Sequence, residues 1–318
     1  MKKSIKLNFT SFWEGFDAKN NYFLDILSQK YDINQSNSPD FLLYGNSGYD
    51  FLNHKCIRIH YSAECVKPNY FQCDFAFSHE LSEGKNHRLP HYAVRCDTKK
   101  LVENTNLAKI LADKQYFCAM LSSNAKAQER HGFFEVLQRY KPVHSGGRVL
   151  NNIGYNPQDK MAFIQKYKFN LCFENQKGIG YTTEKLCDAM LAGCIPIYWG
   201  NPLAFLDFNP KAFIQAADYK TFDKLLECIV EIDQNDEMYK NMLLEPKLNK
   251  NRLYHTASPE AVLEKFEYIF SKKDSFVPVA QSWKSGFLPT YCNQKLEKLG
   301  NKIQFLHTQL NQRQNQLY

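Results

Sequence analysis

The stretch Phe169–Asn201, FNLCFENQKGIGYTTEKLCDAMLAGCIPIYWGN, decides the fold of this chain. It begins with the short apolar run Phe169–Phe173, which is bounded by polar residues and therefore predicts a buried strand. A loop with two glycines over Gln176–Gly180 comes next, and a helix is predicted to run from there to about Ala192. Cys194–Trp199 is a second apolar run, so the stretch predicts a strand, a loop, a helix and another strand.

The start of the predicted helix has the features of an anion site. Thr182 or Thr183 can cap the helix, and Gly193 suits the position just after its end. The free backbone N–H groups and the helix dipole attract negative charge, and Lys185 adds a full positive charge at the same end. These features predict a site for a substrate that carries a phosphate or a diphosphate.

The length and composition indicate a folded protein with two domains. A chain of 318 residues suits two domains of roughly 100–200 residues each, and the 24 Phe and 19 Tyr residues argue against disorder. The net charge is +7, and residues 271–318, with seven positive and two negative side chains, carry +5 of it. The near-neutral body disfavours nucleic-acid binding, and the basic tail is the part that could contact an anionic surface.

The cysteines and the apolar segments bear on the cellular compartment. The ten cysteines form no Cys-x-x-Cys pair, and we interpret them as small buried hydrophobic residues rather than as metal ligands or disulfides. The sequence shows no continuous apolar core of a secretory signal, and no apolar stretch approaches the roughly 18 residues of a membrane span. We therefore expect a cytoplasmic protein that is soluble or lies peripherally on the inner membrane.

Residues 1–113 predict a first α/β domain. Short apolar runs alternate with a segment of helical spacing, and this βαβ rhythm is typical of a parallel sheet with helices on its faces. The expected strands are Ile5–Phe9, Pro39–Tyr44, Cys56–Tyr61 and Cys73–Phe77, and the expected helix is Tyr22–Tyr31. Asp97–Lys114 is expected to form a helical connector to the next domain.

Residues 114–270 predict a second α/β domain, which contains the opening stretch. Its other expected elements are a strand over Gln115–Leu121, helices over about Gln128–Arg139 and Lys160–Tyr167, a loop over Val143–Val149 and an amphipathic stretch over Phe222–Ile232. Neither domain repeats the sequence of the other.

Residues 271–318 predict a basic linker followed by a coiled-coil tail. Apolar residues recur there in an a/d heptad pattern at Leu296, Leu299, Ile303, Leu306, Leu310 and Leu317. We favour a homodimer that pairs through this pattern over a single amphipathic helix docked on the body. Peripheral membrane contact is a weaker alternative, since Trp283, Phe287, Leu288 and Tyr291 lie among lysines just before the heptads.

The carboxyl ends of the expected strands are where an open α/β sheet binds ligands. Arg130 and Lys185 would be natural partners of a diphosphate there, because the Arg fork can hold two phosphate oxygens and Lys acts as a point charge. A solvated surface pair is the alternative that spacing alone leaves open. The residues that follow expected strands are Glu64, the segment Ser122–Arg130, Asn175 and the loop Tyr181–Lys185.

Two acids are further candidates. Glu184 lies beside the predicted phosphate site and could accept hydrogen bonds from sugar hydroxyls, or it could simply stabilise the helix dipole. Glu64 follows a strand of the other domain and could take a proton from an attacking hydroxyl, or it could be a plain surface acid. The sequence has no Asp-x-Asp clamp, so we infer no obligatory metal, with stimulation by a divalent cation such as Mn²⁺ left open.

A long, ordered signature runs through the opening stretch: FNLCFEN at 169–175, GYTTEK at 180–185 and IPIYWG at 195–200. Further matches flank it at 117–124, Arg130, Gly146-Gly147 and 154–156, and thinner ones occur at Tyr61-x-x-Glu64, 74–76 and 88–92. On these motifs the chain resembles the α-1,3/4-fucosyltransferases of glycosyltransferase family 10, most closely the bacterial members of the Helicobacter type. The resemblance covers residues 55–270 well and the rest, including the heptad tail, loosely.

This resemblance implies two Rossmann-like domains that face each other across a cleft, the arrangement called GT-B. The second domain would bind GDP-fucose and the first the acceptor sugar. The implied reaction is inverting transfer of L-fucose to the 3-hydroxyl of N-acetylglucosamine in N-acetyllactosamine-type glycans, as in Lewis antigens on a lipopolysaccharide O-chain. By the resemblance, Glu64 is the general base, Arg130 and Lys185 bind the diphosphate, and the other substrate-binding positions are Tyr61, Asn175, Tyr181, Glu184, Gly146 and Gly147.

Two other functions remain as alternatives. One is another nucleotide-sugar transferase of the same fold with a different donor. The other is a catalytically silent sugar-binding or scaffolding protein, against which the joint presence of Glu64, Arg130 and Lys185 argues. The choice between the 3-hydroxyl and the 4-hydroxyl of the acceptor is not fixed by the sequence.

Overall fold

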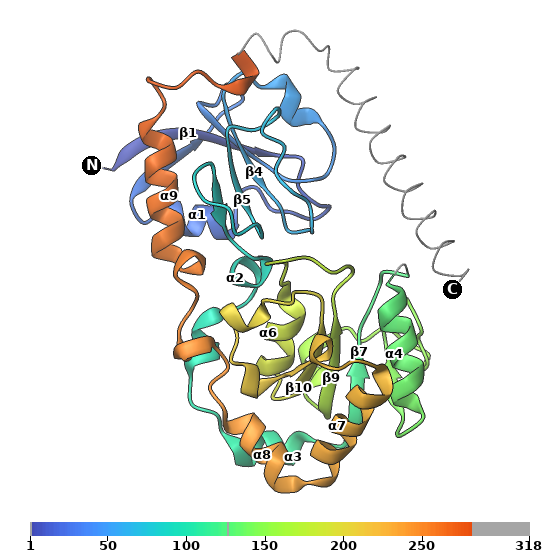
Figure 1. Cartoon of the computed structure of the whole chain (residues 1–318). Helices are drawn as coiled ribbons and strands as arrows, with labels where there is room; N and C mark the ends of the chain where they lie inside the picture. Colours follow the sequence, from blue (N-terminus) through green and yellow to red (C-terminus); the bar gives the residue numbers. More distant parts are fainter. Residues whose placement is uncertain (1, 126, 282–318) are drawn as a thin grey trace.

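The computed structural model describes residues 2–125 and 127–281, which form two α/β units, each built on a parallel sheet (Figure 1). The expected heptad tail and its pairing lie outside the described residues. Within those residues, none of the helices has the length and apolar character needed to cross a membrane.

The first sheet has six strands in the order β2-β1-β3-β4-β5-β6, and every neighbouring pair is parallel. The four expected strands are confirmed. The sequence did not predict β2 and β6, because these short edge strands are polar and lack an apolar run. The strands are β1 Lys3–Thr10, β2 Tyr31–Gln35, β3 Phe41–Tyr44, β4 Ile57–Tyr61, β5 Phe75–Ser78 and β6 Asn86–Arg88.

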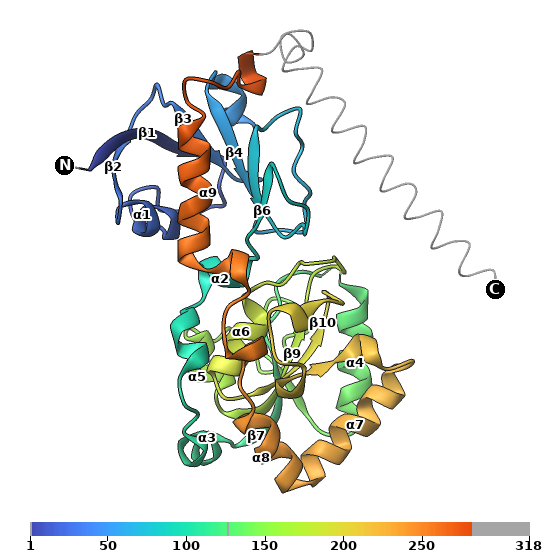
Figure 2. The same ribbon diagram turned by 60° about the vertical axis from the view of Figure 1, so that its left-hand side comes forward.

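One face of this sheet is covered by α1 Tyr22–Leu27 and α9 Pro259–Ser271. Asn21 caps α1, which ends before the expected Tyr31, because that residue begins β2. On α9, the ring of Phe266 packs 4.7 Å from that of Phe77. The expected second domain, 114–270, therefore differs from the structure, in which α9 belongs to the first sheet (Figure 2).

The second sheet has five parallel strands in the order β11-β10-β9-β7-β8. The strands expected at its centre are confirmed, and β8 lies in a segment expected to be a loop. The strands are β7 Tyr116–Met120, β8 Val143–Ser145, β9 Tyr167–Phe173, β10 Ile195–Trp199 and β11 Ile214–Gln215.

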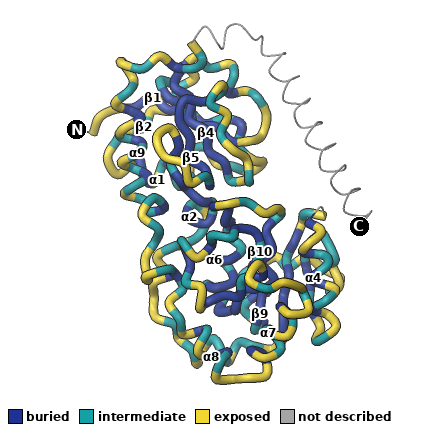
Figure 3. Tube along the Cα trace, viewed as in Figure 1, coloured by how far each residue is buried: buried dark blue, intermediate teal, exposed yellow. Residues whose placement is uncertain are grey.

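Helices cover both faces of the second sheet, and its strands are among the most buried parts of the chain (Figure 3). The helices of this unit are α3 Leu107–Asp113, α4 Gln128–Gln138, α5 Lys160–Ile164, α6 Glu184–Leu191, α7 Phe222–Gln234 and α8 Asp236–Leu244. The 3-10 helices within the described residues are η1 Asp50–Asn53, η2 Thr98–Val102, η3 Ala204–Leu206, η4 Pro210–Ala212, η5 Ala216–Asp218, η6 Asn249–Asn251, η7 His255–Ala257 and η8 Val279–Gln281.

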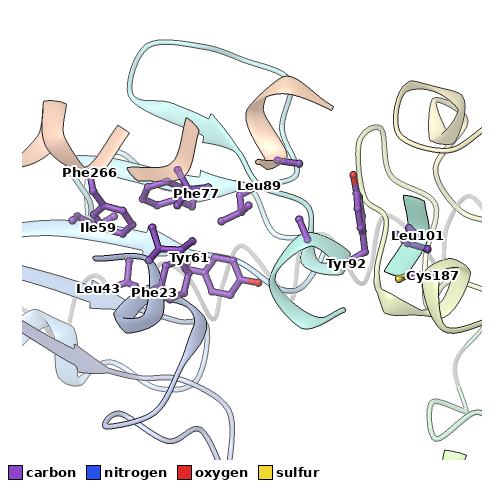
Figure 4. Packing of buried hydrophobic residues seen from close by; sticks show 14 of the residues in the cluster. Phe23, Leu43, Ile59, Tyr61, Phe77, Leu89, Tyr92, Leu101, Cys187 and Phe266 are labelled. Atoms are coloured by element: carbon purple, nitrogen blue, oxygen red, sulfur yellow. The ribbon is translucent and has the colours of Figure 1, made fainter. Parts of the chain in front are cut away.

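The short helix α2 His91–Arg95 joins the two units. A single apolar cluster runs from the first sheet through Tyr92 of α2 to Cys187 of α6 (Figure 4). A buried ion pair adds to this contact, because Arg88 Nη1 lies 2.9 Å from Asp207 Oδ1 and Tyr92 Oη donates to the same oxygen at 2.9 Å. Apolar burial and charge together fix the position of one unit against the other.

Candidate active site

The order of the strands directs two open loop regions toward one cavity. In each sheet the chain changes direction between two adjacent strands, β1 and β3 in the first and β7 and β9 in the second. Such a switch point leaves a crevice at the carboxyl ends of the strands. A cavity of about 620 Å³ lies there, lined by the loops that follow β1, β3, β4 and β9, by α2 and by the start of α6.

Six of the nine residues predicted from the sequence line this cavity. Glu64 and Tyr61 come from the first unit, and the other four come from the second: Asn175, Tyr181, Glu184 and Lys185. Arg130, Gly146 and Gly147 are not among its lining residues. The structure thus brings the predicted base and one predicted cation to the same space from opposite units.

Arg130 lies behind the cavity wall and is 2 % exposed. On the β9 side, Nε and Nη2 both donate to the carbonyl oxygen of Phe173, and Nη2 also donates to Asn175 Oδ1. On the β7 side, Nη1 donates to Ser122 Oγ and to the carbonyl oxygen of Asn124. Each of the five guanidinium N–H groups therefore has a protein acceptor. Arg130 ties the end of β7 to the end of β9 and presents a fixed positive charge rather than an open fork.

The charge of Arg130 has no carboxylate within ion-pair distance among the described residues. Burial lowers the pKa of the guanidinium, while the nearby Glu174 carboxylate opposes that effect. A buried charge without a counter-ion is costly, so this place favours an anion on the cavity side of Asn175.

Glu174 is a fully buried acid that the sequence reasoning did not single out as a site residue. Its Oε1 accepts from the backbone N–H of Thr183 at 2.8 Å, and its Oε2 accepts from Lys185 Nζ at 2.9 Å. Part of the helix start that we expected to be open to phosphate is thus occupied by the protein's own carboxylate. The side chain of Thr183 makes no cap bond to α6, because its hydroxyl also donates to Glu174.

Lys185 keeps its charge at the edge of the cavity. Burial would lower the pKa of its ammonium, but the Glu174 and Glu184 carboxylates outweigh burial and raise the pKa above its ordinary value. Its side chain is 20 % exposed, so the ammonium can still meet a ligand in the cavity.

Glu184 faces the cavity as an ionised acid. Burial would raise its pKa, but Lys185, Lys160 and His91 lower it to about 2. Lys160 Nζ lies 3.8 Å from Glu184 Oε1 and also binds Asp188 at 2.5 Å. Because Lys185 and Lys160 compensate the acid, Glu184 can lie beside a phosphate site and accept hydrogen bonds from hydroxyl groups.

Glu64 and Tyr181 meet across the boundary between the units. Tyr181 Oη donates to Glu64 Oε2 at 3.2 Å, and Glu64 itself is exposed. Burial raises the pKa of Tyr181, with further contributions from Glu174 and Glu64, so the phenol stays protonated and able to donate.

Two glycines allow this close approach of the units. A Cβ on Gly178 would overlap Cys65 Sγ, and a Cβ on Gly180, which has φ +78°, would overlap the carbonyl oxygen of His79. Gln176 Nε2 also donates to the carbonyl oxygen of Cys65 at 3.1 Å. The loop before α6 therefore rests directly on the segment that carries Glu64.

The predicted pair Gly146 and Gly147 has a different place. Gly147 packs against the backbone of Ser122, and Gly146 packs against Pro157. They shape the loop beside Ser122, which accepts a hydrogen bond from Arg130, and they contribute no surface to the cavity.

The residues of the cavity wall that the sequence reasoning missed include Trp13, Asn46, His91 and Arg95. Trp13 and Asn46 follow β1 and β3, so the strand-end rule could have found them. His91 and Arg95 are one helical turn apart on α2, and nothing in their spacing signals the cavity. Among the described residues, no group of three or more His, Cys, Asp or Glu side chains is arranged to hold a metal ion.

Both units match sequence families. Residues 111–244 match the family described as glycosyltransferase family 10 (fucosyltransferase), C-terminal part, and residues 7–95 match the alpha-(1,3)-fucosyltransferase FucT N-terminal domain. The Alpha-(1,3)-fucosyltransferase FucT of Helicobacter pylori is 32 % identical over 313 residues, with 83 % of this chain and 66 % of that protein covered. This chain belongs to glycosyltransferase family 10.

Solved structures agree with this family assignment. An α1,3-fucosyltransferase crystallised with GDP is 30 % identical, has a TM-score of 0.75, and covers 87 % of this chain and 92 % of its own. The same kind of enzyme with GDP-fucose is 28 % identical with a TM-score of 0.75. Among curated relatives, Alpha-(1,3)-fucosyltransferase B of Drosophila melanogaster is 29 % identical over 170 residues. The chain spans 66 % of the length of the Helicobacter pylori enzyme and 38 % of the fly enzyme.

Proposed function

We propose that this family 10 member transfers L-fucose from GDP-β-L-fucose to the 3-hydroxyl of N-acetylglucosamine in N-acetyllactosamine-type acceptors, including those of lipopolysaccharide O-chains that carry Lewis antigens. Relatives described as α-1,3-fucosyltransferases, and structures of such enzymes with GDP and with GDP-fucose, support the donor and the reaction type.

One observation carries the proposal: a single cavity receives a carboxylate from one unit and a cation from the other, with a second cation behind its wall. Glu64 lies on the first side, and Lys185, with Arg130 behind Asn175, lies on the second. On the second side, Lys185 lies near two acids, the buried Glu174 and the ionised Glu184. Arg130 also lies near Glu174, and Glu184 is also close to Lys160. The placement of Lys185 at the cavity edge, rather than a net positive charge, is what would favour a diphosphate there.

The geometry suits a single displacement with inversion. Glu64 takes the proton of the acceptor hydroxyl, and the oxygen then bonds to the anomeric carbon of fucose on the face opposite GDP. The bond from that carbon to the diphosphate oxygen breaks, and its electron pair leaves with GDP. Since Tyr181 already donates to Oε2 of Glu64, Oε1 is the oxygen available for the proton.

Charge stabilisation of the leaving group falls to the second unit. Negative charge grows on the diphosphate as the bond breaks, and Lys185 at the cavity edge with the fixed charge of Arg130 behind it stabilises that charge most in the transition state. Glu184 accepts hydrogen bonds from donor hydroxyls. We propose that these two cations make a metal ion dispensable, with stimulation by a divalent cation left open; a chelator should then leave turnover in place.

The direct test is transfer from GDP-fucose to a panel of type 1 and type 2 disaccharides, with the product linkage read by NMR. The proposal requires an α-1,3 linkage on type 2 acceptors, and Glu64→Gln should lose turnover while retaining GDP binding. The alternative transferase is separated by competition between GDP and UDP for the same site. Preference for UDP, or nucleotide binding without turnover on any acceptor, would contradict the proposal.

A further inference from the structure

We propose that His91 binds the acceptor sugar: its Nε2–H donates a hydrogen bond to a hydroxyl of a neutral pyranose ring that lies against a wall formed by Trp13 and His91. This inference rests on the proposed function, because it assigns the acceptor half of the same cavity.

His91 occupies the point where the two units join. It is the first residue of α2 and lines the cavity between the first sheet and the start of α6. Its imidazole lies beside Trp13 and Tyr61, and the charges of Glu184, Lys185 and Arg95 act on it. An acceptor sugar held here would contact the first unit, while the fucose of the donor would contact the second.

The hydrogen bond to Tyr61 fixes the tautomer of His91. Tyr61 is 1 % exposed, and its Oη lies 2.8 Å from His91 Nδ1, the one hydrogen-bond partner found for that hydroxyl among the described residues. The hydroxyl points toward α2 (Figure 4). Burial raises the pKa of Tyr61 well above its ordinary value, so the phenol keeps its proton. The buried O–H needs an acceptor, and Nδ1 is that acceptor, which leaves the imidazole proton on Nε2.

The environment also keeps the imidazole neutral. Burial lowers the pKa of His91, Lys185 and Arg95 act in the same direction, and Glu184 opposes them. No described protein atom bonds to Nε2. His91 therefore offers the cavity one uncharged N–H donor, which matches a sugar hydroxyl better than it matches a phosphate.

The aromatic rings beside His91 suit a pyranose. The ring of Trp13 is centred 6.0 Å from that of His91 and 6.5 Å from that of Tyr61, and Trp13 is 42 % exposed. Aromatic surface with a few placed polar groups is typical of a small-molecule site. Glu64 follows Tyr61 by three residues, so a sugar on this wall lies next to the base that must deprotonate it.

Two substitutions of His91 separate the effect of its N–H group from the effect of its size and shape. His91→Phe keeps an aromatic ring and removes the N–H, whereas His91→Gln places an amide N–H near the position of Nε2. We expect His91→Phe to raise the KM for the disaccharide acceptor roughly 3–10-fold, the cost of one hydrogen bond, with the KM for GDP-fucose unchanged within about 2-fold. His91→Gln should retain an acceptor KM close to that of the unmodified protein. A rise confined to the GDP-fucose KM, or equal effects of both substitutions, would overturn the inference.

A second measurement does not depend on turnover. In the ¹⁵N spectrum of the histidine rings, the signals lost in His91→Gln belong to His91, and they should show a protonated Nε2 and an unprotonated Nδ1. N-acetyllactosamine alone should shift the Nε2 signal, and Tyr61→Phe should mix the tautomers. A proton on Nδ1, or no response to the disaccharide at millimolar concentration, would refute the role of His91. If the disaccharide shifts Nε2 while GDP-fucose is never consumed, the acceptor subsite stands and the proposed fucosyl transfer falls.

Discussion

Tyr181 of the second unit donates a hydrogen bond to Glu64 of the first, with 3.2 Å between Oη and Oε2. This bond joins a residue of the proposed donor side to the proposed base on the proposed acceptor side. The orientation of Glu64 therefore depends on the loop before α6, and the two sides of the cavity are connected before any ligand arrives.

Tyr181→Phe tests this connection, because it keeps the buried ring and removes the hydroxyl. We expect kcat to fall roughly 10-fold, since hydrogen bonds to charged groups contribute about 1.5–3 kcal/mol. Calorimetry should find GDP affinity nearly unchanged. Tyr116→Phe, at a half-exposed tyrosine outside the cavity, is the matched control and should keep full turnover. Unaltered kcat in Tyr181→Phe would show that the bond does not position Glu64.

Glu174→Gln should destabilise the free protein and increase its response to GDP. The change leaves Lys185 without its buried ion-pair partner and removes a carboxylate charge that acts on Arg130, and breaking a buried pair costs about 3–5 kcal/mol. A diphosphate would then compensate more of the charge than it does in the unmodified protein. Thermal unfolding with and without saturating GDP measures both effects, and a GDP-induced rise in Tm no larger than that of the unmodified protein would contradict the prediction.

Asp207→Asn should weaken the junction between the units. Asp207 is fully buried and holds Arg88 and Tyr92, so we expect the free energy of unfolding to fall by about 3–5 kcal/mol in urea. Asp223→Asn is the control, because its ion pair with Arg139 is largely exposed and should be worth less than about 1 kcal/mol. Equal effects of the two substitutions would mean that the buried pair adds nothing beyond a surface pair.

Gly180→Ala separates backbone strain from close contact. Gly180 and Gly84 both have positive φ, but only at Gly180 would a Cβ meet another residue, the carbonyl oxygen of His79. Gly84→Ala should lose about 1–2 kcal/mol of stability and keep its turnover. Gly180→Ala should also lose at least about 10-fold in kcat, because a loop displacement of about 1 Å can cost 100-fold. Steady-state kinetics on the folded variants measures this difference in kcat. Similar kcat values for both variants would show that the contact with His79 does not affect turnover.

Glu184 should contribute a pH-dependent part of stability. Its pKa of about 2 in the folded protein lies below the ordinary value of 4.5, so its ionised form stabilises the fold above about pH 4.5. That contribution is lost as the pH falls from about 4.5 toward 2. The stability difference between the unmodified protein and Glu184→Gln, from urea unfolding, should be constant from pH 7 to pH 5 and smaller at pH 3. A difference that grows on acidification would contradict this sign.

The sequence predicted the elements whose signal is local. The apolar runs that became β4 and β9 were found, whereas β2 and β6 were missed because polar edge strands leave no such run. The packing of α9 on the first sheet is a contact between residues far apart in the chain, and no spacing within α9 reports its partner.

In the site, too, the residues with a local sequence signal were predicted and the contacts between distant residues were not. The strand-end rule and the family resemblance located Glu64, which comes shortly after β4, and Lys185, which lies in the first turn of α6 at the predicted helix start. The partners of these residues were not predictable, because Glu174 under Lys185 and Tyr181 on Glu64 depend on how loops from different strands or units meet. His91 was missed for the same reason, since its Tyr61 partner is thirty residues away.

The return of α9 to the first sheet makes that unit discontinuous along the chain. A fragment that stops after α8 would leave the α9-facing rings of Phe23, Phe41 and Phe77 in water, and it would be prone to aggregate rather than to fold. A chimera that exchanges the second unit for that of a relative therefore needs two crossover points, one between α2 and α3 and the other between α8 and α9. Under the proposed function, such a chimera would exchange the donor half and leave the core of the acceptor half intact.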